Sequence, residues 1–242
     1  MSPSASIAET CDLEAQQCKQ DVHRPAVTTS LMATPAEPRH RQLADPSPLG
    51  LLAFAQALFL ISLFGVSPKG VTVPNVLISS LIAYGGLGQT IAGIFAFIHG
   101  NTFGATVFCT YAGFQLSYAL IYLPGSGIIA AYTDTVTGLP TAEFTQAIAL
   151  FIWAWFIVTM IFTVAATRSN LIMLLVLVFT DLTLLFLACQ YHTGIAALGT
   201  AASAFGFVTA FLAYWAGAAA LWSVATPINV PMFPLVKQEK SA

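Results

Sequence analysis

The sequence predicts an all-α, polytopic membrane protein with six transmembrane helices, and three observations predict it. Hydrophobic residues make up 57% of the 242 residues and charged residues only 7%, whereas a soluble domain carries about 25% charged residues. Only five charged residues lie between Leu49 and Phe233. Apolar runs such as 171–179 lack the alternation of apolar and polar residues that a membrane β-barrel requires. The formal charge of -2 and the lack of a basic run also exclude a nucleic-acid-binding protein.

Six apolar stretches are each close to the roughly 20 residues that a helix needs to cross a hydrocarbon core of about 30 Å. Turn-forming Gly, Pro, Ser and Asn residues separate these stretches. The predicted spans are 49–66, 76–98, 104–123, 144–166, 171–189 and 197–224.

The polar residues divide the chain into three regions. We predict a disordered cytoplasmic N-terminal tail for 1–44, because this region is rich in Ser, Ala, Gln and Pro and has no apolar surface to offset the entropy of ordering. We expect residues 45–226 to form the six-helix transmembrane domain and 227–242 a short cytoplasmic C-terminal tail. Cytoplasmic termini leave seven Lys and Arg residues inside and only Lys69 outside, as the positive-inside rule requires. No apolar signal-peptide core precedes the first span, so we expect that span to direct insertion.

Three motifs rich in proline or glycine mark helix starts and close helix contacts. Asp-Pro-Ser-Pro-Leu-Gly-Leu at 45–51 begins the first span, where proline suits the first turn and an Asp can cap free N–H groups. Tyr-Gly-Gly-Leu-Gly-Gln at 84–89 lies in the second span, where glycines let backbones approach closely. In Gly-Asn-Thr-Phe-Gly at 100–104, either Asn101 or Thr102 is placed to cap the third helix, whose N-terminus could attract an anion.

In order and spacing, these motifs resemble those of the acetate uptake transporter family, which includes bacterial succinate-acetate permeases and yeast acetate and ammonia-export proteins. The first motif is similar to the family's Asn-Pro-Ala-Pro-Leu-Gly-Leu signature, and the likeness extends over about 45–224. The polar extension ahead of it is similar to that of the fungal branch. The residues that the resemblance assigns to the substrate entrance and the family motifs are Asp45, Pro46, Pro48, Leu49, Gly50, Tyr84, Gln89, Asn101, Thr102, Phe103 and Gly104.

The resemblance also implies a hexamer in which each protomer has its own pathway. In this family the pathway narrows at a Phe from the first helix, a Tyr from the third and a Leu from the fifth, which correspond here to Phe54, Tyr111 and Leu182. An apolar neck of this kind can gate by dewetting, and the tyrosine hydroxyl could hydrogen-bond a passing carboxylate. Ordinary core packing is the alternative interpretation of these three side chains.

Two departures from the family pattern bear on the substrate. Asp45 replaces the usual Asn and puts a negative charge where an anionic substrate is thought to enter. Gln115 stands where relatives commonly have a large aromatic residue, and its spacing places it on one helix face with Tyr111 and Tyr118. We therefore take Gln115 as a candidate for determining specificity.

Asp181 interrupts the otherwise apolar fifth span. A carboxylate inside a span costs roughly 2.5 to 3.5 kcal/mol on insertion scales and by default marks a functional residue, here a candidate for proton coupling. The alternative is a structural Asp that is hydrogen-bonded to a Thr, Ser or Tyr of a neighbouring helix. An Asp at the neck would repel acetate unless it is protonated or paired. A cation or a neutral solute is therefore an alternative substrate.

Together these features predict a transporter or channel for small monocarboxylates, with acetate first and succinate or propionate next, in symport with a proton across the plasma membrane. The expected partners are the carboxylate anion, the proton, the lipid bilayer and further copies of the chain. A membrane sensor or signalling subunit and a transporter of ammonium or a neutral solute are the alternatives. An enzyme is not expected, because His99 and His192 fall in turns on opposite faces and no nucleophile–base pair is visible. Neither a metal site nor a cofactor is expected, because the four cysteines have no metal-ligand spacing.

Overall fold

The computed structural model describes residues 43–71, 73 and 75–235. Within these residues the chain is almost entirely helical, and the only β-structure consists of two isolated bridges, Thr133 to Pro140 and Asn170 to Pro234. The predicted all-α fold is therefore confirmed. The predicted N-terminal tail lies outside the described residues except for Leu43 and Ala44, and so do residues 236–242 at the C-terminus.

The long helices begin and end close to the predicted boundaries. Their bounds are α2 (Ser47–Gly65), α3 (Asn75–Ser80), η2 (Leu81–Gly86), α4 (Leu87–Ile98), α5 (Thr102–Tyr122), α7 (Ala142–Ala166), α8 (Leu171–Thr193) and α9 (Ala196–Ala225). Two short elements, η1 (Pro68–Gly70) and α6 (Ile128–Ala131), lie in the connections. The segment η2 is a π-helix that joins α3 to α4 within one rod, and it contains the Tyr-Gly-Gly part of the second motif. Such π-helical turns occur frequently at functional sites.

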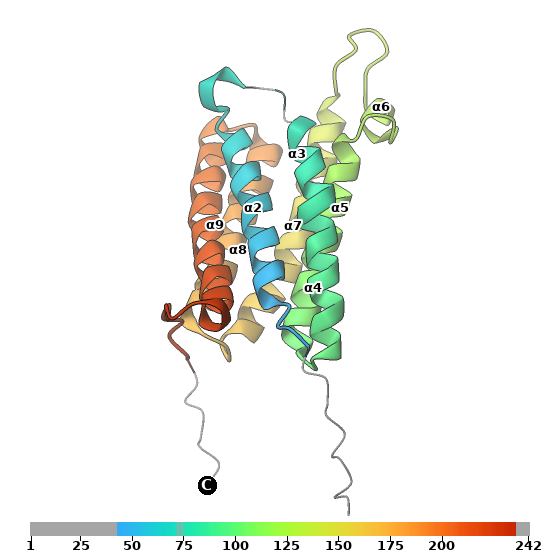
Figure 1. Cartoon of the computed structure of the whole chain (residues 1–242). Helices are drawn as coiled ribbons and strands as arrows, with labels where there is room; N and C mark the ends of the chain where they lie inside the picture. Colours follow the sequence, from blue (N-terminus) through green and yellow to red (C-terminus); the bar gives the residue numbers. More distant parts are fainter. Residues whose placement is uncertain (1–42, 72, 74, 236–242) are drawn as a thin grey trace, which may run out of the picture. The chain divides into compact units, whose positions relative to one another are not determined.

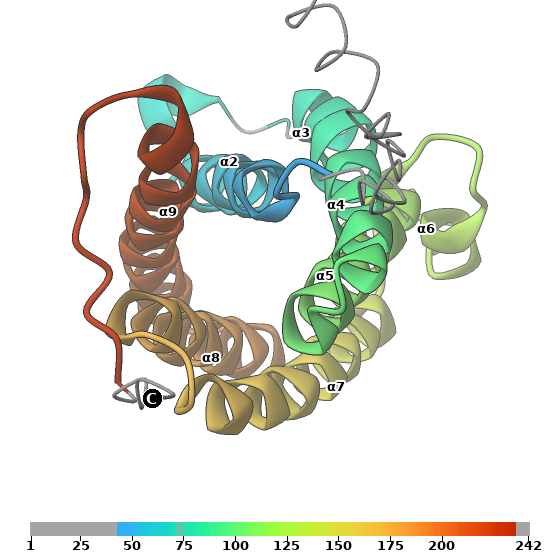
Figure 2. The same ribbon diagram turned by 60° about the horizontal axis from the view of Figure 1, so that its bottom comes forward.

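The helices of residues 43–235 stand side by side as a bundle (Figure 1). Seen end-on, they follow one another around a ring in the order α2, α9, α8, α7, α5 and α4 (Figure 2). α9 packs against both α2 and α8, α8 packs against α7, and α4 packs against both α5 and α2. The beginning of α2 and the end of α9 lie at the same end of the bundle (Figure 1).

Five helical rods of the described residues are long and apolar enough to cross a membrane: α2, the rod Asn75–Ile98, α7, α8 and α9. α5 has 21 residues and so is long enough. It falls short in hydropathy because it carries threonines, tyrosines and Gln115. The number of six spans and the cytoplasmic position of the termini therefore stay predictions.

The first motif fixes the start of α2 and its contact with α5. The backbone N–H and the hydroxyl of Ser47 both donate to Asp45 Oδ1, at 2.9 and 2.7 Å, while Pro46 and Pro48 occupy positions where a helix needs no backbone donor. A Cβ atom at Gly50 would lie 2.7 Å from the ring of Phe108 on α5. Only a glycine leaves room for this approach, which brings α2 against one wall of the cavity described next.

Candidate functional site

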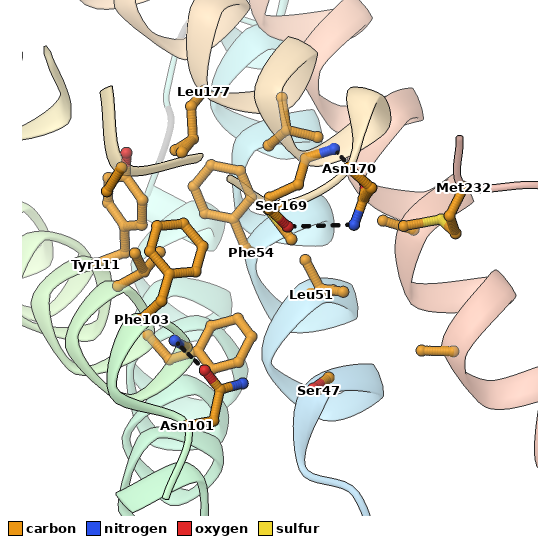
Figure 3. Close-up of a pocket in the computed structure, with 18 of the residues that line it drawn as sticks. Ser47, Leu51, Phe54, Asn101, Phe103, Tyr111, Ser169, Asn170, Leu177 and Met232 are labelled. Carbon is orange, nitrogen blue, oxygen red and sulfur yellow. Dashed lines mark hydrogen bonds between the residues drawn. The ribbon is translucent and has the colours of Figure 1, made fainter. Parts of the chain in front are cut away.

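A cavity of about 550 Å³, the first cavity, lies at the end of the bundle where α2, α5 and α8 begin (Figure 3). Its wall is mainly apolar, and the polar groups gather toward the helix termini. The residues that line it include Leu51, Phe54, Gln89, Phe103, Val107, Phe108, Tyr111, Val176, Leu177 and Met232.

The mouth of the first cavity combines one cationic side chain with two helix N-termini. Asn101 and Asn170 line the cavity and cap α5 and α8, since the Oδ1 atom of each accepts a backbone N–H at 2.9 Å. The positive ends of these two helix dipoles therefore face the mouth. Arg168 adds a full positive charge, and Asp45 adds a negative one whose Oδ1 is already occupied by Ser47. Arg168 and the two N-termini favour an anion at this place.

The inner part of the first cavity is closed by Phe54, Tyr111 and Leu177, which we call the neck. The rings of Phe54 and Tyr111 have centroids 5.0 Å apart, and Tyr111 also packs edge-on against Phe162 at 5.9 Å. All four side chains are buried in one cluster, where Leu177 is 1% exposed. Figure 3 shows the three neck residues pointing toward one another.

A second cavity of about 290 Å³ lies toward the opposite end of the bundle. α2 contributes residues up to Phe54 to the first cavity and from Ile61 onward to the second, so the neck lies between the two. Every residue that lines the second cavity in the described part of the chain is uncharged. They include Ser62, Tyr118, Tyr122, Thr183, Gln190, Tyr191 and Ser203.

Leu182, expected at the neck, lines neither of the two cavities and is only half-buried. It lies five residues beyond Leu177, which corresponds to about 140° around the helix axis. The structure thus brings the expected Phe54 and Tyr111 together with a different leucine of the same helix.

Asp181 of α8 is buried and is hydrogen-bonded to Thr163 of the neighbouring helix α7. Its exposed fraction is 7%, and its Oδ2 lies 2.6 Å from the hydroxyl of Thr163, while its Oδ1 has no partner among the described residues. Thr163 Oγ1 also lies 3.1 Å from the carbonyl oxygen of Thr159. Tyr111 donates its hydroxyl to Thr159 Oγ1 at 3.1 Å. This arrangement matches the structural alternative, an Asp bound to a Thr of a neighbouring helix. Thr159 lies between the two groups, with its carbonyl oxygen toward Thr163 and its hydroxyl toward Tyr111.

Gln89 and Gln115 form a second buried polar group, on the α4–α5 side of the bundle. Gln115 Nε2 donates to Gln89 Oε1 at 2.6 Å. The expected helix face is present, since Tyr111, Gln115 and Tyr118 are all buried. Gln89 lines the first cavity, whereas Gln115 lies behind it.

The remaining residues of the motifs differ in their distance from the site. Phe103 and Gly104 line the first cavity, whereas Thr102 is exposed at the start of α5 and Tyr84 is half-buried in η2, and neither of these lines a cavity. Pro46, Pro48, Leu49 and Gly50 shape the start of α2 instead. Among the described residues, no group of three or more His, Cys, Asp or Glu side chains is placed to hold a metal ion.

Among the lining residues that sequence reasoning missed are Arg168, Asn170, Leu177 and Met232. Asn170 directly precedes an apolar run, which is a helix-capping signal and could have been recognised. Met232 belongs to a C-terminal segment that crosses the mouth, where the backbone N–H of Leu171 donates to the carbonyl oxygen of Phe233 at 2.9 Å. Such a contact between distant segments leaves no signal in the sequence.

Comparison with known proteins finds curated relatives in fungi. The chain is 38% identical over 178 residues to Accumulation of dyads protein 2 of Saccharomyces cerevisiae. It is 34% identical over 178 residues to Ammonia transport outward protein 2 of the same yeast, and each of these two matches covers 74% of this chain and 61% of the relative. It is 37% identical over 151 residues to Acetate permease A of Emericella nidulans, which covers 62% of this chain and 50% of the relative. The matched part thus spans between 50% and 61% of these relatives' own length.

The fold is similar to that of the solved structure of the bacterial acetate channel SatP, with a TM-score of 0.67. The sequences are 24% identical, and the match covers 79% of this chain and 99% of that one. The family described as GPR1/FUN34/yaaH matches residues 27–237 of this chain. The resemblance found from three motifs is therefore confirmed, and it points to transport proteins and not to enzymes, as expected. With its apolar helices, the chain is a multi-pass integral membrane protein and belongs to the GPR1/FUN34/yaaH family.

Proposed function

We propose that this chain conducts acetate and similar small monocarboxylates across a membrane, from the first cavity through the neck to the second cavity. The observation that carries the proposal is the pair of cavities toward opposite ends of the bundle, separated by the buried side chains of Phe54, Tyr111 and Leu177. The names of the relatives support this substrate, since one of them is called an acetate permease.

Entry begins at the mouth of the first cavity. The N-termini of α5 and α8 and the guanidinium of Arg168 attract the carboxylate. Asp45 opposes this attraction less than a free carboxylate would, because its Oδ1 accepts two hydrogen bonds from Ser47. The Asn-to-Asp departure at this position is therefore compatible with an anionic substrate.

The neck is the barrier. Its apolar walls exclude water when no solute is present, which gates the pathway by dewetting. The hydroxyl of Tyr111 is the polar group of the neck, and it can turn from Thr159 to a passing carboxylate. In this way Tyr111 exchanges Thr159 for the solute as its hydrogen-bond partner inside an apolar ring.

We further propose that Asp181 carries the coupled proton. A threonine hydroxyl has one proton, yet Thr163 Oγ1 lies within hydrogen-bond distance of two acceptors, the carbonyl oxygen of Thr159 and Asp181 Oδ2. Both contacts are hydrogen bonds at the same time only when Asp181 carries a proton and donates it to Thr163. Loss of that proton turns Thr163 toward the carboxylate and away from the carbonyl oxygen of Thr159, the residue whose hydroxyl accepts from Tyr111.

Ammonium or neutral ammonia is the second candidate substrate. The uncharged second cavity, lined by hydroxyl and amide groups, would hold a small neutral solute as well as a protonated acid. One relative is named for outward transport of ammonia. If the purified protein transports no solute, a sensor or signalling subunit with this fold becomes the favoured function. The homohexamer and the plasma membrane are proposals that rest on the family resemblance.

The test is uptake of labelled acetate into proteoliposomes that contain the purified protein, with and without an inward proton gradient. We expect saturable uptake that the gradient stimulates, and we expect Asp181→Asn to abolish the stimulation. Uptake that is indifferent to the gradient would refute proton coupling, and well-folded protein that moves neither acetate nor ammonium would refute transport.

The neck is tested by a matched pair of variants on α8. Leu177→Ala should raise acetate flux about tenfold, a fall of about 1.4 kcal/mol in the barrier, which is less than the hydrophobic free energy of two methylene groups. Leu182→Ala makes the same chemical change on another face of the helix and should leave the flux unchanged. The opposite ranking of the two variants would assign the neck to Leu182.

A further inference from the structure

Two buried amide side chains on the α4–α5 side of the bundle each have one polar atom without a hydrogen-bond partner among the described residues. Gln89 and Gln115 are 0% and 2% exposed, and a single hydrogen bond of 2.6 Å joins them. Gln89 Nε2 and Gln115 Oε1 have no partner among the described residues. Because a buried unpaired polar atom is costly, each of these two atoms calls for an explanation.

Gly85 in the π-helical segment explains the unpaired atom of Gln115. A Cβ atom at this position would collide with Gln115 Oε1, so the oxygen lies against the Cα–H group of Gly85. A carbonyl oxygen is tolerated there as the acceptor of a weak Cα–H···O contact. An amide NH₂ in the same place would direct its own hydrogens at the glycine hydrogen. Gly85 thereby fixes which end of the Gln115 amide points to Gln89.

The orientation of Gln115 in turn fixes that of Gln89. Since Gln115 donates through its Nε2, Gln89 accepts through its Oε1. The Nε2 of Gln89 is then the end without a partner among the described residues. Gln89 lines the first cavity together with Phe54 and Tyr111, and Gln115 does not. The free end of this buried pair is therefore a hydrogen-bond donor on the cavity side.

We propose that Gln115 is a positioning residue that holds the amide N–H groups of Gln89 toward the first cavity. This orientation of Gln89 makes the inner end of the cavity a binding position for a carboxylate oxygen and not for ammonium. The inference rests on the proposed function, in which the first cavity is part of the pathway. A carboxylate oxygen accepts from Gln89 Nε2 in a charge-assisted hydrogen bond and removes the unpaired donor. An ammonium ion has only donors, so it meets a donor at this position and gains nothing.

The test compares acetate with methylammonium, a labelled ammonium analogue, in proteoliposomes. Gln115→Leu removes the partner of Gln89 Oε1, so the Gln89 amide is free to turn over, and the flux ratio of acetate to methylammonium should fall about tenfold, the value of one hydrogen bond to a charged group. Gln89→Glu replaces the donor by an acceptor and should shift the ratio the same way or further. Gln56→Leu is the matched control, because Gln56 is a half-buried amide of α2 that donates to Ser80 and lines neither cavity.

Thermal unfolding in detergent, with and without acetate, is measured on the same variants. Acetate should raise the Tm of the wild type and of Gln56→Leu, and should fail to raise that of Gln89→Glu. An unchanged flux ratio in Gln115→Leu, or the same acetate-induced Tm shift in Gln89→Glu as in the wild type, overturns the inference. A wild type that moves neither solute overturns the proposed function alone, and the Tm shifts then decide whether Gln89 binds a carboxylate.

Discussion

Replacing Gly50 by alanine should destabilise the bundle, because the new methyl group enters the ring of Phe108. The Cβ atom would lie 2.7 Å from two carbon atoms of that ring and 2.8 Å from a third, whereas ordinary contact begins at 3.4 Å. Phe108 packs against Leu51, Ala92 and Ile172, so the ring can retreat only by turning into the first cavity that it lines. Overpacking of a filled core costs about 1–3 kcal/mol, and we expect Gly50→Ala to fall in that range.

The assay is equilibrium unfolding of the purified protein in mixed detergent micelles. Gly113→Ala is the control, since Gly113 lies within α5 with nothing within 4 Å of its Cβ position, and this variant should be neutral or slightly stabilising. Phe108→Leu should rescue Gly50→Ala, because the smaller side chain vacates the space. The reasoning fails if Gly50→Ala is as stable as Gly113→Ala, or if Phe108→Leu adds its own cost without any rescue.

Three further predictions concern the hydrogen bonds and charges of the site. Tyr111→Phe removes the donor to Thr159 and should lower the free energy of unfolding by only about 0.6 kcal/mol, a typical value for such bonds in membrane bundles. Acetate flux should fall severalfold, and a full loss of folding would contradict this prediction. Arg168→Gln should slow acetate uptake at low ionic strength. Because Arg168 is exposed, the difference from the wild type should disappear in about 1 M salt, where the Debye length is about 3 Å. A difference that persists at high salt would contradict electrostatic attraction of the anion by Arg168. Trp215→Phe removes the indole N–H that donates to the carbonyl oxygen of Pro231 at 3.1 Å, so limited proteolysis should cut the C-terminal segment faster, and equal cleavage rates would show that this bond does not hold it.

Most of the helical architecture could be predicted from the sequence because local chemistry marks it. The turn residues between apolar runs located the helix ends to within a few residues. Asn101, which caps α5, was one of the two candidates that its place before a helix suggested. The main difference lies in the second helix, where the structure has a π-helical segment at 81–86. Its glycines were visible, but a pattern of small residues predicts close packing and not the number of residues in a turn.

The site could be predicted only in part, because α8 is apolar all around its circumference. A helix with polar residues on one side reveals which face turns inward, but a run of leucines and valines does not. The sequence therefore predicted a leucine of the fifth span beside Phe54 and Tyr111 but not which one, and the structure packs Leu177 and not Leu182 in their cluster. α5 gave a better prediction, because the polar residues Tyr111 and Gln115 mark one of its faces, and both are buried.

α5 is less apolar than the other long helices because it carries polar side chains. Two of these side chains, Tyr111 and Gln115, line or adjoin the first cavity. Polar side chains within a span are expensive when they face lipid, so they belong to faces enclosed by protein. Between Val107 and Ala119 only Gly113 is exposed, so this part of α5 turns almost no polar group outward. α7 is the opposite case, since Leu150, Ile157 and Ile161 are each more than 60% exposed on its surface. Low hydropathy in one helix of such a bundle therefore indicates enclosure, and the enclosed part of α5 supplies Tyr111 to the neck and Gln115 behind it.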